Sequence, residues 1–228
     1  MKKIHLVHLY AKEMNIYGDT GNRIILENRL KWRGIGVKTT IVNQGDKIPT
    51  DADIIIGGGG QDKGQQQVEA DLKKKAETIK SMGADGVVML MICGMYQLFG
   101  EVFITKDQQK IEGIGVLPMH TEASDQRMIG NISLDTEFGV VVGYENHSGK
   151  TWLHEGCTSF GRVKKGFGNN GSDKLEGARL NNIFASYLHG PILSKNPLLA
   201  DGLLRLALGN NGTQLSALDD SLEQIAAT

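Results

Sequence analysis

Cys93 and His189 are the two residues of this chain whose type and position favour covalent chemistry. Cys93 directly follows the apolar run Gly86–Ile92, and His189 ends a second apolar run that begins at Ile183. A cysteine at a strand-to-helix turn lies over free backbone N–H groups, which favour thiolate over thiol. A remote imidazole can take the thiol proton and return it to a leaving amine. Together they predict acyl transfer. Alone, Cys93 is equally well explained as a buried thiol, and His189 is better explained as a satisfied histidine at a strand end.

A run of four glycines, Gly57–Gly60, follows the apolar segment Asp53–Ile56. Consecutive glycines let backbone N–H groups converge on a negative oxygen, either a developing oxyanion or a phosphate. The run lacks the Gly-Lys-Ser/Thr of a P-loop and does not match the dinucleotide fingerprint. By itself it is equally well explained as a flexible loop.

The other cysteine and most of the histidines carry no such pattern. Cys157 lies outside any strand-end turn, so we interpret it as an ordinary thiol. The spacing of His5, His8, His120 and His154 indicates no metal-binding cluster. We therefore expect no metal site in this chain.

The composition excludes several classes of function. The 228 residues contain 25 Lys and Arg against 26 Asp and Glu, a net charge of -1, which argues against a dedicated nucleic-acid binder. The chain contains no stretch of about 18 apolar residues, so we predict no membrane span. The start of the chain lacks the pattern of a signal peptide, and we expect a cytoplasmic protein. Two cysteines cannot form a disulfide framework. Glycine is abundant, at 30 residues, which suggests several places of close backbone approach.

The elements that must hold these residues alternate between strands and helices. The expected strands are Ile4–Leu9, Val37–Val42, Asp53–Ile56, Gly86–Ile92 and Ile183–Leu188, and the expected helices are Gly18–Trp32, Gln65–Met82 and Pro197–Leu208. In the second helix we expect Lys73, Lys74 and Lys75 to face water. The middle of the chain is predicted to be looser, with short strands at Met128–Leu134 and Gly139–Tyr144 and a loop at Gly166–Gly171.

This alternation predicts one α/β domain of three layers, with a doubly wound and mostly parallel sheet. Residues 1–208 would form its core and residues 209–228 a polar tail with a possible short helix. Ligands of such sheets bind beyond the carboxyl ends of the strands. Cys93, the glycine run and His189 are all expected at that edge, which favours a cysteine hydrolase with a glycine-lined oxyanion site.

Several separated motifs resemble one family. The segment from Cys93 to Gly100 resembles the nucleophile elbow of class I, triad-type glutamine amidotransferases, particularly their cobyric-acid-synthase-like branch. His189-Gly190-Pro191 and the segment Tyr144–Gly149 are similar to further motifs of that branch. The segments Asn15–Asn22 and Gly58–Asp62 look like those of the glutaminase subunits of lipid II isoglutaminyl synthases. The resemblance extends from about residue 3 to residue 208.

The resemblance implies a flavodoxin-like glutaminase fold and a set of roles. Cys93 would be the nucleophile that forms a thioester with L-glutamine, and His189 the general base and acid. Gly59, Gly60 and Gly94 would offer the oxyanion N–H groups. Arg127 would hold the substrate α-carboxylate, for which a guanidinium is well suited, and Gln97 would help position the substrate. Without the resemblance, Arg127 would not rank above Arg162 or Arg179.

The resemblance also implies a partner. Ammonia would pass to a Mur-ligase-like synthetase, which would carry ATP and magnesium and amidate the α-carboxyl of D-glutamate in the peptidoglycan stem peptide. No cofactor is expected in this chain. Two alternatives remain open: a glutaminase that serves another acceptor, such as a cobyric-acid-type precursor, and a non-catalytic α/β scaffold.

The sequence departs from the family pattern at two positions. Pro191 stands where triad-type enzymes commonly carry the glutamate that orients the histidine, so the third catalytic group is expected elsewhere, in this chain or on the partner. Met91 stands two residues before the cysteine, where many relatives have glycine, and we expect it to crowd the elbow.

Overall fold

A six-stranded sheet lies at the centre of the computed structural model, which describes residues 3–209 and 215–227. Its strand order is β11 (Ala178–Leu180), β12 (Ile183–Ser186), β4 (Val88–Ile92), β3 (Ile54–Gly57), β1 (Ile4–Leu9) and β2 (Val37–Val42). Every neighbouring pair is parallel except β11 and β12. The strands β1, β3, β4 and β12 therefore end at one edge of the sheet, as the sequence predicted.

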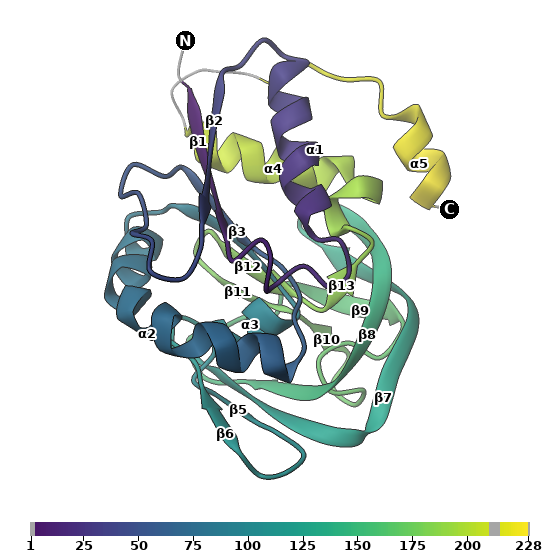
Figure 1. Cartoon of the computed structure of the whole chain (residues 1–228). Coiled ribbons are helices and arrows are strands. Elements are labelled where there is room, and N and C mark those ends of the chain that lie inside the picture. Colours follow the sequence, from purple (N-terminus) through teal and green to yellow (C-terminus); the bar gives the residue numbers. More distant parts are fainter. Residues whose placement is uncertain (1–2, 210–214, 228) are drawn as a thin grey trace.

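Helices cover both faces of this sheet. Figure 1 shows α1 (Thr20–Lys31) and α4 (Pro197–Leu208) on one side and α2 (Asp62–Ala84) on the other. The short helix α3 (Gly94–Phe99) follows β4 directly, and the 3₁₀ turn η1 (Ile192–Lys195) leads into α4. The strands β1, β3 and β4 are buried along their whole length because helices cover them from both sides. The predicted three-layer, mostly parallel α/β fold is confirmed.

One detail of α2 was predicted wrongly. Lys75 is buried rather than turned to water, whereas Lys74 is exposed. The Lys75 ammonium pairs with Asp71, which also accepts a hydrogen bond from Tyr10, and it lies 5.7 Å from the centre of the Tyr10 ring. A long aliphatic stem with a paired ammonium can be buried in this way, so the hydrophobic stripe alone misplaced this lysine.

The middle of the chain forms a second sheet, which the sequence underestimated. The long antiparallel hairpin of β7 (Met119–Thr136) and β8 (Gly139–Leu153) forms most of it, where only short runs were expected. The remaining strands are β5 (Val102–Ile104), β6 (Lys110–Glu112), β9 (Gly161–Lys165), β10 (Leu175–Glu176) and β13 (Leu188–His189). β7 includes poor strand formers such as Gly130 and Asn131, which are held in the strand by antiparallel pairing with β8. For this reason the length of β7 could not be predicted from its composition.

The last described segment contains the possible short helix, α5 (Ser221–Ala227). It is preceded by Asp220, which forms a two-pronged contact with the buried Arg29 of α1, and Arg29 also pairs with Asp201 of α4. Residues 210–214 and 228 of the expected tail lie outside the described part of the chain. Among the described helices, none has the length and apolar character required to cross a membrane.

Candidate active site

Cys93 occupies a strained turn between β4 and α3. Its backbone has a φ of +52° and a ψ of -105°, a conformation that residues other than glycine rarely adopt. The turn is held by hydrogen bonds from the Cys93 N–H to the Ser186 carbonyl (2.8 Å) and from the Gln97 N–H to the Cys93 carbonyl (3.0 Å). Such a turn holds the side chain of a nucleophile at the sheet edge.

The residues around this turn are small where the backbones approach each other. A Cβ atom on Gly94 would lie only 2.7 Å from the Gly60 carbonyl oxygen, so the β3 loop and the elbow are in close contact. Met91 does not crowd the elbow as expected. It faces Gly57 of β3 in the strand register, and its sulfur would lie 3.0 Å from a Cβ at that position. Because Gly57 has no side chain, Met91 has room against β3.

His189 lies on the other side of the glycine loop and is almost fully buried. Its Nδ1 is 3.3 Å from Oδ1 of Asp19, at the start of α1. A Cβ on Gly59 would lie 2.9 Å from Cε1 of His189, 3.1 Å from Oδ2 of Asp19 and 3.4 Å from Cβ of Cys93. These three side chains therefore converge on one point, which only glycine leaves open.

The electrostatic surroundings favour a protonated imidazole. Burial lowers the pKa of His189, but hydrogen bonds and negative charge from Asp19 and Cys93 outweigh burial and bring the pKa well above its ordinary value of 6.5. The three residues can thus hold an imidazolium between a carboxylate and a thiolate.

Asp19 is the residue that sequence reasoning missed. It precedes α1, in the position of a helix cap, yet it forms no side-chain cap hydrogen bond. Its two oxygens instead contact the Gly59 N–H (2.7 Å) and the His189 imidazole. The missing carboxylate at position 191 thus has a counterpart in this chain, on the loop after β1.

The same contact changes the predicted oxyanion set. The Gly59 N–H donates to Asp19, so it is not free to donate to a substrate oxygen. No hydrogen bond from the N–H groups of Gly60 and Gly94 to another residue is found in residues 3–209 and 215–227. Of the three predicted donors, these two are available.

A cavity of about 400 Å³ opens beside the cysteine and contains the predicted binding residues. Both Arg127 and Gln97 line it together with Cys93 and Gly60. Arg127 lies at the irregularity in β7 between Ala123 and Met128, which interrupts the pairing with β8. Tyr17 and the stretch Asn146–Gly149, which belong to two of the segments that carry the family resemblance, also line it, as do Gln65 and Phe103, which the sequence did not single out.

The two predicted binding side chains differ in how free they are. Arg127 is exposed, and its Nε donates to Asn146 Oδ1 (2.7 Å), which leaves the guanidinium other donors. The buried Gln97 amide already donates to the Tyr187 hydroxyl (3.2 Å) and accepts from Gln65 (2.7 Å). Of these two side chains, Arg127 is thus the one with donors free for a carboxylate, and Gln97 is a fixed part of the cavity lining.

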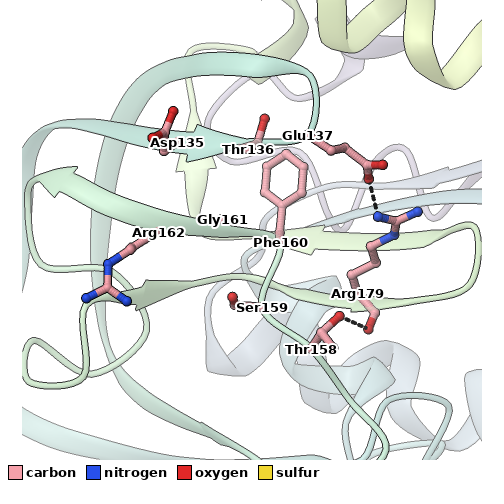
Figure 2. Close-up of a pocket in the computed structure, with 9 residues that line it drawn as sticks. All are labelled: Asp135, Thr136, Glu137, Thr158, Ser159, Phe160, Gly161, Arg162 and Arg179. Carbon is pink, nitrogen blue, oxygen red and sulfur yellow. Dashed lines mark hydrogen bonds and ion pairs between the residues drawn. The ribbon is translucent and has the colours of Figure 1, made fainter.

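A second recess of about 410 Å³ contains the two arginines that competed with Arg127 in the sequence. Figure 2 shows Arg179 pointing toward Glu137, with which it forms an ion pair, while Arg162 points away from both. Neither cysteine nor histidine is among the nine residues that line this recess. It therefore lacks the groups that acyl transfer requires.

His147 lines the cavity, whereas His5, His120 and His154 lie apart from this arrangement. His120 and His154 are within 2.7 Å of each other through their ring nitrogens, and His5 contacts Asp51 and Thr40. Cys157 is half-buried, and burial raises the pKa of its thiol. Among the described residues, no group of three or more His, Cys, Asp or Glu side chains is arranged to hold a metal ion.

Comparison with known proteins adds independent information. A family model described as the CobB/CobQ-like glutamine amidotransferase domain matches residues 5–197. The subunit GatD of lipid II isoglutaminyl synthase (glutamine-hydrolyzing) from Staphylococcus aureus is 39% identical over 93% of this chain and 87% of that protein. Cobyric acid synthase from Sphingopyxis alaskensis is 29% identical over 84% of this chain but only 40% of its own length.

Solved structures support the fold. The structure of PurLQS from Thermotoga maritima matches with a TM-score of 0.61 at 18% identity, over 91% of this chain and 98% of that one. A crystal structure described as a glutamine amidotransferase matches with a TM-score of 0.60, also at 18% identity, over 89% and 99% of the two chains.

Proposed function

Because the chain belongs to the CobB/CobQ-like glutamine amidotransferase family, and is therefore an enzyme of that class, we propose that it is the glutaminase subunit of a lipid II isoglutaminyl synthase. It hydrolyses L-glutamine and supplies ammonia for amidation of the D-glutamate α-carboxyl in the lipid II stem peptide. The convergence of Cys93, His189 and Asp19 on Gly59 is the observation that carries the hydrolysis. The similarity to the S. aureus subunit over nearly the whole length of both chains carries the choice of acceptor.

Hydrolysis begins with attack of the Cys93 sulfur on the amide carbon of glutamine. The carbonyl oxygen becomes an oxyanion, which the N–H groups of Gly60 and Gly94 stabilise. His189 then gives its proton to the amide nitrogen, the carbon–nitrogen bond breaks, and ammonia leaves a thioester on Cys93. Water attacks this thioester while His189 accepts a proton from it, and glutamate departs as the thiol side chain is restored.

Asp19 acts on this sequence through His189. Its carboxylate accepts the Nδ1–H bond, which fixes the ring so that the other nitrogen faces the cysteine, and stabilises the imidazolium. The contact with the Gly59 N–H ties the same carboxylate to the glycine loop. Asp19 is thus a positioning residue, and this role replaces that of the glutamate absent at Pro191.

Substrate recognition falls to the cavity beside the cysteine. Arg127 binds the glutamine α-carboxylate, since a guanidinium held at Nε by Asn146 can still donate from its other nitrogens. Gln97 contributes through its fixed amide, which joins Gln65 to Tyr187 and forms part of the cavity lining.

The ammonia acceptor lies on a separate Mur-ligase-like subunit, which carries ATP and magnesium and activates the carboxyl group. This chain needs no cofactor for hydrolysis, and we place the complex in the cytoplasm, where ATP is available. The relationship to cobyric acid synthase favours a second candidate acceptor, a corrinoid precursor side chain, but the chain spans only 40% of that relative.

A glutamine-hydrolysis assay with and without the co-purified synthetase tests the proposal. We expect ammonia release together with amidation of a lipid II analogue when ATP is present. A glutamine-mimicking electrophile followed by peptide mass mapping is expected to label Cys93. Amidation of a corrinoid carboxylate in place of lipid II would favour the second candidate, and absence of glutamine hydrolysis in both preparations would contradict the enzymatic mechanism.

A further inference from the structure

Tyr17 connects the two halves of the site, and neither the sequence motif nor the hydrolytic mechanism gives it a role. It lies on the loop between β1 and α1 and lines the cavity beside Cys93. The loop is fixed on both sides of Tyr17, because the Ile16 N–H donates to the Gly59 carbonyl (3.1 Å) and the Thr20 N–H donates to Oδ1 of Asn15 (2.8 Å). The tyrosine is therefore held in place by backbone contacts of its neighbours.

One part of Tyr17, its ring, packs against the imidazole of His189. The two ring centres are 4.2 Å apart with an angle of 44° between the planes. Asp19, two residues along the same loop, contacts Nδ1 of that imidazole. The loop thus contacts the His189 imidazole in two ways, through Asp19 at Nδ1 and through the Tyr17 ring. The Tyr17 ring limits tilting of the imidazole away from Cys93.

The other part, the hydroxyl, belongs to a side chain that lines the same cavity as Arg127. Burial and the negative charge of Cys93 raise the pKa of Tyr17, whereas the positive charge of Arg127 acts in the opposite direction. Asn146 accepts from Nε of the same guanidinium. Arg127, which is exposed and lies at an irregular position of β7, therefore has a polar neighbour on each of two segments of the chain.

We propose that Tyr17 is a positioning residue that acts on both binding and proton transfer: its hydroxyl orients Arg127 toward the substrate α-carboxylate, and its ring keeps His189 aligned with Cys93. This inference rests on the proposed glutaminase function and on the proposed role of Arg127. The two contributions of Tyr17 can be measured separately, because loss of the hydroxyl should raise KM and loss of the ring should lower kcat.

Two substitutions in the synthetase complex separate these contributions. Tyr17→Phe removes only the hydroxyl, so we expect KM for glutamine to rise about 3- to 10-fold, the range for loss of one hydrogen bond, with kcat within about twofold. Tyr17→Leu also removes the ring, so we expect kcat to fall by about tenfold or more in addition. Ser159→Ala, which removes a hydroxyl in the recess of Figure 2, away from the cavity, is the control and is expected to change neither constant.

A second substrate tests the link to Arg127. With a glutamine analogue whose α-carboxylate is replaced by a carboxamide, Tyr17→Phe is expected to leave KM at the wild-type value for that analogue, because no carboxylate requires the oriented guanidinium. Circular dichroism and thermal unfolding of each variant establish that a loss does not come from misfolding.

The outcomes distinguish this inference from the function on which it rests. If Arg127→Ala raises KM but Tyr17→Phe does not, the role of the Tyr17 hydroxyl is wrong and the glutaminase mechanism stands. If Tyr17→Phe raises KM equally for glutamine and for the carboxamide analogue, the hydroxyl acts on general packing and the inference is overturned. If the wild-type complex fails to hydrolyse glutamine, the proposed function itself fails.

Discussion

The segments that follow the parallel strands and the long hairpin contribute different kinds of residue to the site around Cys93. The segments after β1, β4 and β12 contain the groups that would exchange protons and form bonds, namely Asp19, Cys93 and His189, and all three are at least nine-tenths buried. His189 itself lies in β13, which pairs with β8 of the second sheet. The second sheet supplies Arg127 and Asn146, of which Arg127 is exposed. The comparison separates a buried set of side chains, for which we propose the reaction, from an exposed arginine, for which we propose substrate recognition.

This difference has a physical cause. Parallel strands bring the ends of several segments to one edge, so residues distant in sequence meet in a water-poor environment where their charges interact strongly. The long β7–β8 hairpin borders the cavity at the irregular stretch of β7, and the Arg127 side chain there is exposed to solvent. Substitutions in the first region should therefore reduce kcat, and substitutions in the second should mainly raise KM.

The largest expected effect comes from the nucleophile. Cys93→Ala removes the thiol at the converging strand ends, so we expect glutamine hydrolysis to fall by about 10⁴-fold or more while glutamine binding is retained. The measurements are ammonia release and the thermal shift produced by glutamine. Cys157→Ala is the matched control, because that thiol lies outside the cavity, and its activity should equal that of the wild type. Hydrolysis that survives in Cys93→Ala would show that another group reacts.

Asp19→Asn should give the next largest effect. The amide cannot stabilise the imidazolium as the carboxylate does, so we expect kcat to fall by about 10- to 10³-fold with a small change in KM. Asp19 raises the pKa of His189, so its neutralisation should lower that pKa. The alkaline limb of the kcat–pH profile should accordingly move to lower pH.

The same variant decides which chain orients the imidazole. If Asp19 has this role, the isolated subunit and the synthetase complex lose activity to the same degree on substitution. An unchanged pH profile, together with high activity only in the complex, would instead assign the orienting group to the partner.

Arg127→Ala tests the recognition side of the comparison. The loss of a charged hydrogen-bonding partner for the α-carboxylate should raise KM by about 10- to 100-fold and leave kcat within a few-fold. Arg162→Ala, in the recess of Figure 2, offers an arginine removed from the cavity as the control and should change neither constant. A kcat loss that exceeds the KM change in Arg127→Ala would erase the distinction between the buried side chains and the exposed arginine.

Local sequence patterns were sufficient to predict the position of Cys93 directly after a parallel strand. For His189 the prediction was only partly right, because the expected strand Ile183–Leu188 ends at Ser186 and His189 lies in β13, which pairs with β8 of the second sheet. The resemblance to a known family was needed to choose Arg127 from among three arginines. Its place depends on the irregularity in β7, and no periodicity of the sequence indicates a break in pairing between strands that are themselves hard to recognise.

Asp19 shows a different limit. An aspartate just before a helix is ordinarily explained by capping, and no local pattern favours a contact with a histidine 170 residues away. The choice between a local and a long-range partner for this carboxylate depends on how the loop after β1 packs against the glycine loop. That packing is a property of the tertiary structure rather than of the local pattern.

The smallest expected effect on catalysis concerns Glu176, a carboxyl group buried between the two sheets. Burial raises its pKa from 4.5 to about 8, and the negative charge of the nearby buried Glu145 acts in the same direction, against hydrogen bonds from the Tyr187 N–H and the Ser186 hydroxyl. The folded protein therefore binds this proton more tightly than the unfolded chain between about pH 4.5 and pH 8. Its contribution to stability is complete below pH 4.5 and is lost as the pH rises through 8.

Glu176→Gln tests this contribution, because the amide has the shape of the protonated acid and can still accept from the Tyr187 N–H. We expect kcat and KM to remain at wild-type values. As the pH rises from 4.5 to 8, the wild type should lose stability relative to the variant. The loss in its free energy of unfolding should be at most about 1.4 kcal/mol per pH unit. Urea unfolding at pH 5, 6, 7 and 8 measures it. If the difference in unfolding free energy is the same at all four pH values, Glu176 is already ionised in the folded protein. The protein interior around it would then be more polar than the contrast between a buried reaction centre and a solvated surface implies.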